Sequence, residues 1–295
     1  MSANEPTSAP RESAGPLRIF VLGRANKPRV QEEANRLLPF LEEHCAVVCF
    51  DVTCQEDLSR YEADLALVLG GDGAILRAAR QMGYHQVPVL GINLGKLGFL
   101  ADLSPEDVHE QFPAILRREY RVVDHLMYEC ELLRSDGESD KHLGLNEVVV
   151  LAGPPFKMID IELLVEGEPV TTYSCDGLIV STPVGSTAHS LSAGGPILRQ
   201  DLQAFVITPI CPHTLTNRPL VDRADRTYEL RVARPQKGST LVIDGQVKLP
   251  LRSGDRVQIR RAPVSFQLAK VPGRSYYRTL HQKLGWGGHA QYFER

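Results

Sequence analysis

The stretch LALVLGGDGAILRAAR, residues 65–80, contains a strand, a turn and a helix start in direct succession. Its five leading apolar residues predict a strand buried on both faces, and residues 74–80 predict the first turns of a helix. Between them, three glycines surround Asp72. Such a turn suits phosphate, because main-chain N–H groups point outward and the helix dipole favours an anion. An acid there would repel phosphate unless it binds a metal or accepts a proton, so Asp72 favours phosphoryl transfer over simple binding.

Taken alone, the GGDG turn leaves a purely structural role open, because glycine turns with one acid also occur in ordinary loops. The flanking strand and helix favour the functional interpretation. The turn is not a dinucleotide fingerprint, since no G-x-G-x-x-G follows a strand, and it is not a Walker loop, since G-x-x-x-x-G-K-[ST] is absent.

Length and composition predict an ordinary globular protein with two domains. The chain has 295 residues, of which 43% are hydrophobic, and a net charge of −3, which gives no sign of a nucleic-acid or membrane surface. Residues 1–16 are polar, lack an apolar signal core and are expected to form a disordered tail. Six cysteines without a CxxC pair predict free thiols in a reducing cytoplasm.

The first part of the chain predicts an α/β domain over residues 17–125. Strands are expected at 17–22, 46–50, 65–69 and 87–92, with a helix over 29–43 and another from Ala74. This alternation favours a parallel sheet, whose ligands lie beyond the carboxyl ends of the strands. The glycine-rich segments 70–73 and 91–98 both follow strands and are therefore able to converge. Ser104 and Pro105 predict a further helix start.

Residues 126–265 predict a second, β-rich and mostly antiparallel domain of short strands, and residues 266–295 are expected to return to the first domain. The run STPVGSTAHSLSAGGP, residues 181–196, is either an exposed linker or a binding loop rich in hydrogen-bond donors. The strands on both sides favour the binding loop. Asn146-Glu147 is most often a surface pair, and Asp244-Gly245 predicts a hairpin turn, with a functional role the lesser alternative.

These segments together resemble the NAD kinase family, and its bacterial type in particular. The resemblance spans residues 17–286 and rests on five motifs: GGDG at 70–73, GINLGKLGFLAD at 91–102, Asn146-Glu147, DGLIVSTPVGSTAHSLSAGGPI at 176–197, and ITPICPHTLTNRPLV at 207–221. It implies an N-terminal α/β domain like that of phosphofructokinase and diacylglycerol kinase, followed by a β-rich C-terminal domain. It further implies a cytoplasmic homodimer or homotetramer that phosphorylates the 2′-hydroxyl of the adenosine ribose of NAD with ATP and Mg²⁺, giving NADP.

The resemblance also assigns roles to single residues. Asp72 would orient the ribose hydroxyl and accept its proton, while main-chain N–H groups of the GGDG turn hold the ATP phosphates. Asn146 and Glu147 would bind the ribose hydroxyls of NAD, and Asp176 its nicotinamide end, often across a subunit interface. No residue is assigned as a direct metal ligand. The complete set of expected nucleotide-binding residues is Gly71, Asp72, Gly73, Arg77, Phe99, Asn146, Glu147, Asp176, Thr187, Ala188, His189, Ser192 and Gln246.

Three positions depart from the family pattern. Ala74 and Val184 stand where the family usually has threonine, and His189 stands where it usually has tyrosine, which replaces a phenol by a titratable ring. These departures are expected to change the affinity for nucleotide and its pH dependence. None of them alters Asp72 or the Asn146-Glu147 pair.

Two alternative functions remain: another kinase with a GGDG turn, and a non-catalytic sensor of NAD or NADP. The run at 176–197 argues against the first, and retention of Asp72 argues against the second.

Overall fold

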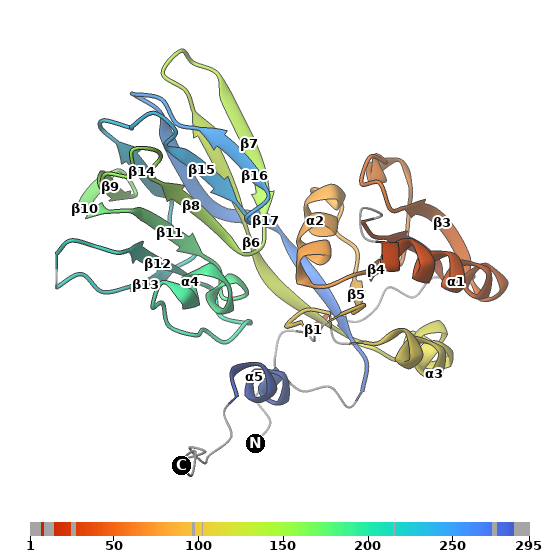
Figure 1. Cartoon of the computed structure of the whole chain (residues 1–295). Coiled ribbons are helices and arrows are strands. Elements are labelled where there is room, and N and C mark those ends of the chain that lie inside the picture. Colours follow the sequence, from red (N-terminus) through yellow and green to blue (C-terminus); the bar gives the residue numbers. More distant parts are fainter. Residues whose placement is uncertain are drawn as a thin grey trace, which may run out of the picture. The chain divides into compact units, whose positions relative to one another are not determined.

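The computed structural model describes residues 7–8, 15–24, 28–95, 98–101, 103–214, 216–272 and 276–285. The chain forms two compact units, each treated by itself: Met1–Val123 with Gln267–Arg295, and Asp124–Phe266 (Figure 1). Most of the tail expected at residues 1–16 lies outside the described residues, as does Trp286. Within that stretch Thr7–Ser8 forms the short strand β1, which pairs with Val122 and Val123.

The first unit is built on a parallel sheet, as the alternation of strands and helices predicts. Its strand order is β17–β5–β4–β2–β3, in which only the last part of β17 takes part, through Leu268. Every residue of β4 is buried, which explains its unbroken apolar sequence. The strands are β2 (Arg18–Leu22), β3 (Ala46–Asp51), β4 (Leu65–Leu69), β5 (Val89–Ile92) and β17 (Arg256–Lys270).

The helices of the first unit follow the apolar periodicity of the sequence. In α1 the buried residues Val30, Ala34, Leu37 and Leu41 recur at helical spacing. The expected start of α3 is confirmed, because the Ser104 side chain accepts from Asp107 N and the Asp107 carboxylate accepts from Ser104 N. The helices are α1 (Pro28–His44), η1 (Leu58–Arg60), α2 (Asp72–Met82), α3 (Pro105–Leu116) and α5 (Tyr276–Leu284).

Helix α2 begins two residues earlier than expected, at Asp72 instead of Ala74. Gly71 is its N-cap, with φ −90° and ψ −168°, and Gly70 before it has φ 135°. An acid in the first turn is favoured by the helix dipole, which explains why Asp72 belongs to the helix and not to a preceding loop. Asp72 and Gly73 thus lie in the first turn of α2.

The second unit consists of antiparallel strands in two sheets, which confirms the predicted β-rich class. Its first sheet contains β10 (Glu168–Cys175), β9 (Ile159–Val165), β14 (Tyr228–Val232), β17, β6 (Arg121–Leu133) and β7 (Ser139–Gly144). Its second sheet contains β13 (Leu220–Arg223), β12 (Ala204–Ile210), β11 (Gly177–Ser181), β8 (Glu147–Leu151), β15 (Thr240–Ile243) and β16 (Val247–Pro250). The sequence pattern did not predict β7, β13 and β16, because their residues are mostly polar or exposed.

A single apolar core joins these two sheets. Alternate residues of several strands enter it, for example Tyr128, Cys130 and Leu132 of β6 together with Val148 and Val150 of β8. This period of two is the signature of strands that turn one face towards a core.

Among the described residues, no helix is long and apolar enough to cross a membrane.

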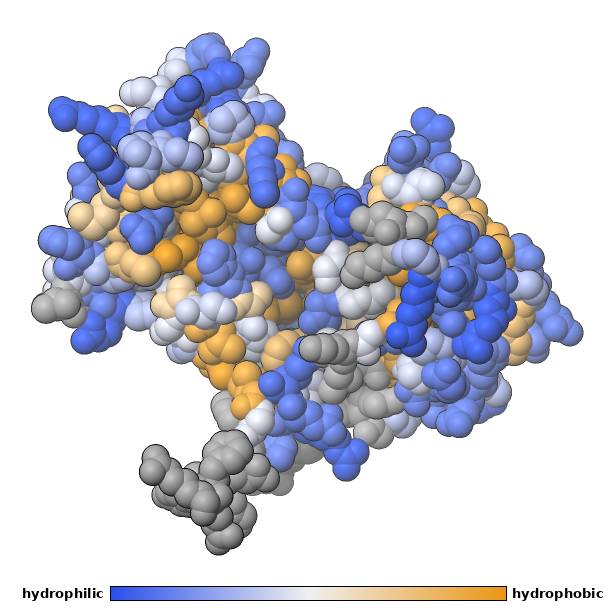
Figure 2. All heavy atoms as spheres, viewed as in Figure 1, coloured by the Kyte–Doolittle hydropathy of each residue, from blue (hydrophilic) through white to orange (hydrophobic). Residues whose placement is uncertain are grey.

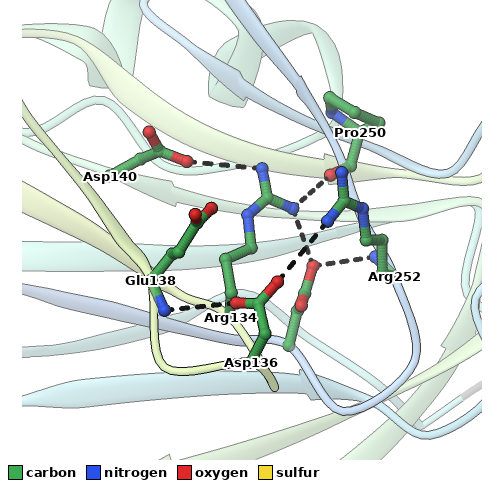
Figure 3. Close-up of polar contacts among 7 residues, drawn as sticks. Arg134, Asp136, Glu138, Asp140, Pro250 and Arg252 are labelled. Atoms are coloured by element: carbon green, nitrogen blue, oxygen red, sulfur yellow. Dashed lines mark hydrogen bonds and ion pairs between the residues drawn. The ribbon is translucent and has the colours of Figure 1, made fainter.

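A polar network fixes the β6–β7 turn to the segment between β16 and β17 (Figure 3). Arg134 donates to the Pro250 carbonyl at 2.7 Å and pairs with the Asp255 carboxylate at 2.9 Å. Asp255 also accepts from the Arg252 main-chain N–H at 2.8 Å. The arginine and aspartate side chains are 8% and 2% exposed, so this pair is a buried structural contact whose charges compensate one another.

Candidate active site

Asp72 is held by the loop that follows β5. Its Oδ2 accepts from Phe99 N at 2.8 Å, and its Oδ1 accepts from Leu100 N at 3.0 Å and Ala101 N at 3.2 Å. The two glycine-rich segments that follow β4 and β5 therefore converge on one carboxylate. Main-chain donors fix both its position and its orientation, since three directed bonds leave the carboxylate little freedom to rotate.

Several glycines of the first unit are required by this arrangement. A Cβ on Gly98 would lie 2.1 Å from Asp72 Oδ1, and one on Gly91 would lie 2.6 Å from the Ile75 side chain and 2.8 Å from Ala101 Cα. Both positions need glycine so that the loop can approach α2.

Gly71 and Gly73 have no such reason to be glycine. Apart from its chain neighbours and the backbone of its own helix, a Cβ at either position would meet no atom of the described residues within 4 Å, and neither backbone adopts positive φ. Glycines that neither packing nor backbone conformation requires leave the main chain open to close approach by a ligand. The open space thus lies at the N-terminus of α2, where an anion is favoured.

Two further expected residues lie in this unit. Arg77 is on α2, and its Nε is buried with no hydrogen-bond partner among the residues that the structure describes. Phe99 is half-buried, and its ring lies 5.3 Å from Lys283 Nζ. Asp72, Phe99 and the two open glycines are thus brought together by hydrogen bonds and chain continuity.

In the second unit, a buried carboxylate organises the segment that carries Asn146 and Glu147. Asp244, 4% exposed, accepts from the main-chain N–H groups of Leu145, Asn146 and Glu147 at 3.0, 2.8 and 3.2 Å. The Tyr128 hydroxyl lies 2.9 Å from Asp244 Oδ1 and 2.8 Å from the Glu147 carbonyl oxygen. This segment is therefore built into the core, and Asn146-Glu147 is not a surface pair.

The run at 181–196 folds against this segment, which favours a binding loop over a linker. Thr182 donates from its N–H to the Asn146 carbonyl at 2.9 Å and from its hydroxyl to the Leu145 carbonyl at 2.5 Å. A Cβ on Gly185 would lie 2.2 Å from the same Asn146 carbonyl oxygen. The run contains a 3-10 turn, η2 (Gly185–Thr187), and a short helix, α4 (His189–Ser192).

Glu147 is 5% exposed, and its Oε2 has no hydrogen-bond partner among the described residues. Burial, and to a smaller extent the charge of Asp244, raise the pKa of Glu147 to about 8, against the opposing effect of a hydrogen bond from the His189 main-chain N–H. Glu147 therefore carries a proton at neutral pH, which makes it a hydrogen-bond donor for a bound ligand.

The remaining expected residues of the second unit occupy two places. Thr187 ends η2, Ala188 lies between η2 and α4, and His189 and Ser192 are exposed residues of α4. Gln246 lies in the turn between β15 and β16, close in sequence to Asp244. Asp176 is exposed and precedes β11. Because β11 runs from there to Ser181, Asp176 stands about 17 Å from the binding loop, at 3.3–3.4 Å per residue. The structure does not bring Asp176 together with Glu147 within one chain.

Of the three departures from the family pattern, Val184 is buried and its carbonyl accepts from the Thr187 hydroxyl at 3.2 Å. Ala74 is half-buried in α2, one residue beyond Gly73. Within the described part of the chain, no group of three or more His, Cys, Asp or Glu residues is arranged to hold a metal ion.

Comparison with protein families matches both units. The ATP-NAD kinase N-terminal domain matches residues 50–120, and the ATP-NAD kinase C-terminal domain matches residues 145–271. The chain belongs to the ATP-NAD kinase family.

Similar proteins agree with this assignment. An NAD kinase of Rhodopirellula baltica is 53% identical over 273 residues, which cover 92% of this chain and 88% of that protein. An NAD kinase of Geobacter metallireducens is 38% identical over 279 residues, 92% of this chain and 99% of that protein.

Two solved structures resemble the fold. A crystal structure of an NAD kinase from Archaeoglobus fulgidus in complex with ATP has 28% identity and a TM-score of 0.69, covering 92% of this chain and 100% of that chain. A crystal structure of yeast NADH kinase complexed with NADH has a TM-score of 0.85 over 98% of this chain and 96% of that chain, and at 22% identity this likeness concerns the fold.

The sequence pattern does not predict two supporting residues, Asp244 and Tyr128. Asp244 forms the expected hairpin turn, with φ 48° followed by Gly245 with φ 65°. Its second role, as acceptor for the segment 145–147, depends on a contact across about a hundred residues of sequence. Tyr128 lies in β6, and its ring explains Gly144, where a Cβ would lie 2.2 Å from it.

We predict that Glu147 titrates near pH 8 in the folded chain, measured by carboxyl ¹³C NMR with the Glu147→Gln variant to identify its signal. Asp244→Asn should lower this pKa, because it removes a neighbouring negative charge. Since Glu147 loses its proton near pH 4.5 when unfolded, its contribution to stability should decline as the pH rises from 4.5 to about 8. A Glu147 signal that titrates near 4.5 in the folded chain would contradict this.

Proposed function

We propose that the chain transfers the γ-phosphoryl group of ATP to the 2′-hydroxyl of the adenosine ribose of NAD, giving NADP, and that Asp72 accepts the hydroxyl proton. Membership of the ATP-NAD kinase family supports the reaction. The observation that carries the role of Asp72 is the set of three main-chain bonds that orient its carboxylate beside an open glycine turn.

The hydrogen-bond pattern selects one oxygen of Asp72 for this task. A carboxylate oxygen accepts about two hydrogen bonds. Oδ1 accepts two, from Leu100 and Ala101, whereas Oδ2 accepts one, from Phe99, among the described residues. Oδ2 therefore has the vacant acceptor position, and we assign it to the ribose hydroxyl.

The N-terminus of α2 suits the phosphates of ATP. Gly71 and Gly73 leave its main chain accessible, and the helix dipole favours the negative charge. The transition state of phosphoryl transfer is loose, so the main task of the protein is to position the nucleophile and neutralise charge. Asp72 then acts by orienting the 2′-oxygen and taking its proton as the new P–O bond forms and the bond to ADP breaks.

Mg²⁺ is expected to accompany ATP, where it neutralises phosphate charge. Mg²⁺ often keeps several waters and is held by substrate phosphates with one or two carboxylates. We therefore propose that the ion is carried mainly by the nucleotide phosphates, and no residue of the chain is assigned as its direct ligand.

The second unit is proposed to bind NAD. Asn146 and a protonated Glu147 would bind the ribose hydroxyls, and Glu147 Oε2, buried without a partner among the described residues, would gain one from the ligand. Asp176, remote from Glu147 in its own chain, would serve the nicotinamide end. Thr187, Ala188, His189 and Ser192 are proposed to line the adenosine pocket of this unit, and Gln246 to bind nucleotide. In the first unit, Phe99 is proposed to border the adenine of NAD, and Arg77 to bind nucleotide.

We further propose that the chain forms a homodimer or homotetramer in the cytoplasm. Figure 2 shows hydrophobic side chains at the surface of the molecule. Leu220 and Val221, on the edge strand β13, are 37% and 45% exposed, and Phe156 is 74% exposed. Apolar residues on an edge strand favour pairing with another chain. The six cysteines are all free thiols, which supports a reducing compartment.

Replacement of Asp72 by Asn tests the proposed base. We expect NADP formation from NAD, ATP and Mg²⁺ to fall by about 100- to 10,000-fold, the range typical of a lost general base. Asp225→Asn, a change of the same kind at an exposed carboxylate, should leave the rate unaltered.

The same assay separates the alternatives. A wild-type chain that binds NAD without forming NADP would be a sensor, and one that phosphorylates only a sugar or lipid would be a different kinase. An Asp72→Asn variant with the activity of the wild type would remove Asp72 from the mechanism.

His189→Tyr tests the adenosine pocket. A tyrosine restores the larger ring and the phenol of the family pattern, so we expect KM for NAD to change more than kcat. Steady-state kinetics with varied NAD give both constants. A change confined to kcat would count against a pocket-lining role for this side chain.

A further inference from the structure

We propose that Lys283, on the C-terminal helix α5, is a positioning residue for Asp72 and acts through the ring of Phe99. Lys283 Nζ lies 5.3 Å from the centroid of that ring, within the range of a cation–π contact. The inference rests on the role proposed for Asp72, and it adds to the site a residue 184 positions beyond Phe99 in the sequence.

The local structure of α5 directs Lys283 to this position. Leu280 is the residue of α5 that is buried, at 4% exposure. Lys283 lies three residues further along, on the same face of the helix. Burial of Leu280 thus fixes the face of α5 from which Lys283 reaches Phe99, while His281 and Gln282 between them are exposed.

Phe99 connects this contact to the carboxylate. Its main-chain N–H is the donor to Asp72 Oδ2, at 2.8 Å. Oδ2 is also the oxygen with the vacant acceptor position. A contact that holds the Phe99 ring therefore limits the movement of the one N–H group that orients this oxygen.

Within the segment 98–101, Phe99 is the residue that is not fully buried. Gly98 N donates to Ala101 O at 3.2 Å, which closes a tight turn, and Leu100 and Ala101 are anchored by burial at 2% and 0% exposure. Phe99 alone in this turn is half-buried. The attraction between the Lys283 ammonium group and the Phe99 ring therefore holds the least buried side chain of this turn.

Lys283→Met tests the proposal, because methionine keeps an unbranched apolar stem and removes the charge. A cation–π contact at a partly exposed site corresponds to about a two- to fivefold effect, so we expect kcat to fall by that factor while KM for ATP stays constant. Lys283→Arg should restore kcat, since a guanidinium also binds a ring face. Gln282→Ala, an exposed neighbour on the same helix, is the matched control and should equal the wild type.

Hydrogen exchange gives a readout that does not depend on activity. In Lys283→Met, the main-chain amides of residues 99–101 should exchange faster than in the wild type, and in Lys283→Arg and Gln282→Ala they should not. Thermal denaturation of each variant reports whether the whole fold has been weakened. Faster exchange at these amides with an unchanged Tm supports the proposal, and unchanged exchange overturns it.

A double-mutant cycle with Phe99→Leu shows whether Lys283 acts through the ring. If it does, Lys283→Met should have no further effect on kcat in the Phe99→Leu background. Additive effects, or a Lys283→Met enzyme with the kcat of the wild type, would overturn the proposal. The same experiments distinguish failure of this proposal from failure of the role proposed for Asp72. In the second case Asp72→Asn would remain active, whatever the exchange rates of the Lys283 variants are.

Discussion

Three main-chain N–H groups on one carboxylate, that of Asp72, are the contact on which the first unit depends. They join the loop after β5 to the first turn of α2 and thereby bring together two glycine-rich segments that follow neighbouring strands. The glycine at position 98 exists because of this contact, since a side chain there would occupy the place of the carboxylate. In contrast, Gly71 and Gly73 face open space. Their lack of a side chain leaves the main chain of α2 accessible to the phosphates of the proposed ligand.

Two other aspartates accept hydrogen bonds from several main-chain N–H groups in the same way, and their role is structural. Asp51 accepts from the main-chain N–H groups of four successive residues, 53–56, and Asp244 accepts from three, 145–147. Burial opposes ionisation of Asp51, yet its hydrogen bonds, from Glu56 and Thr53 above all, outweigh burial and lower its pKa to about 2. Glu147 shows the opposite balance, because burial beside Asp244 prevails over one N–H donor and raises its pKa to about 8. Hydrogen bonds thus outweigh burial at Asp51, whereas burial outweighs the single N–H donor at Glu147 and leaves that carboxyl protonated and available to a ligand.

Much of this was predictable from sequence, and the reasons are local. The apolar run at 65–69, the cap at Ser104 and the succession of short strands in the β-rich half depend on patterns that neighbouring residues determine. The motifs that resemble the NAD kinase family indicated Asp72 and the Asn146-Glu147 pair. What sequence did not reveal depends on contacts between distant segments: Asp244 beneath residues 145–147, Tyr128 against Gly144, and Lys283 over Phe99. Edge strands such as β13 and β16 escaped for another reason, since each has only four residues and none of them is buried.

The central claim is that Asp72 Oδ2 receives the proton of the 2′-hydroxyl of NAD. A crystal structure with NAD and a non-hydrolysable ATP analogue tests it most directly. The account predicts the adenosine 2′-oxygen within about 3.2 Å of Asp72 Oδ2, the reach of a general base, with the Phe99 N–H still bound to the same oxygen. An adenosine ribose bound away from Asp72, with its 2′-hydroxyl donating to another group, would contradict it.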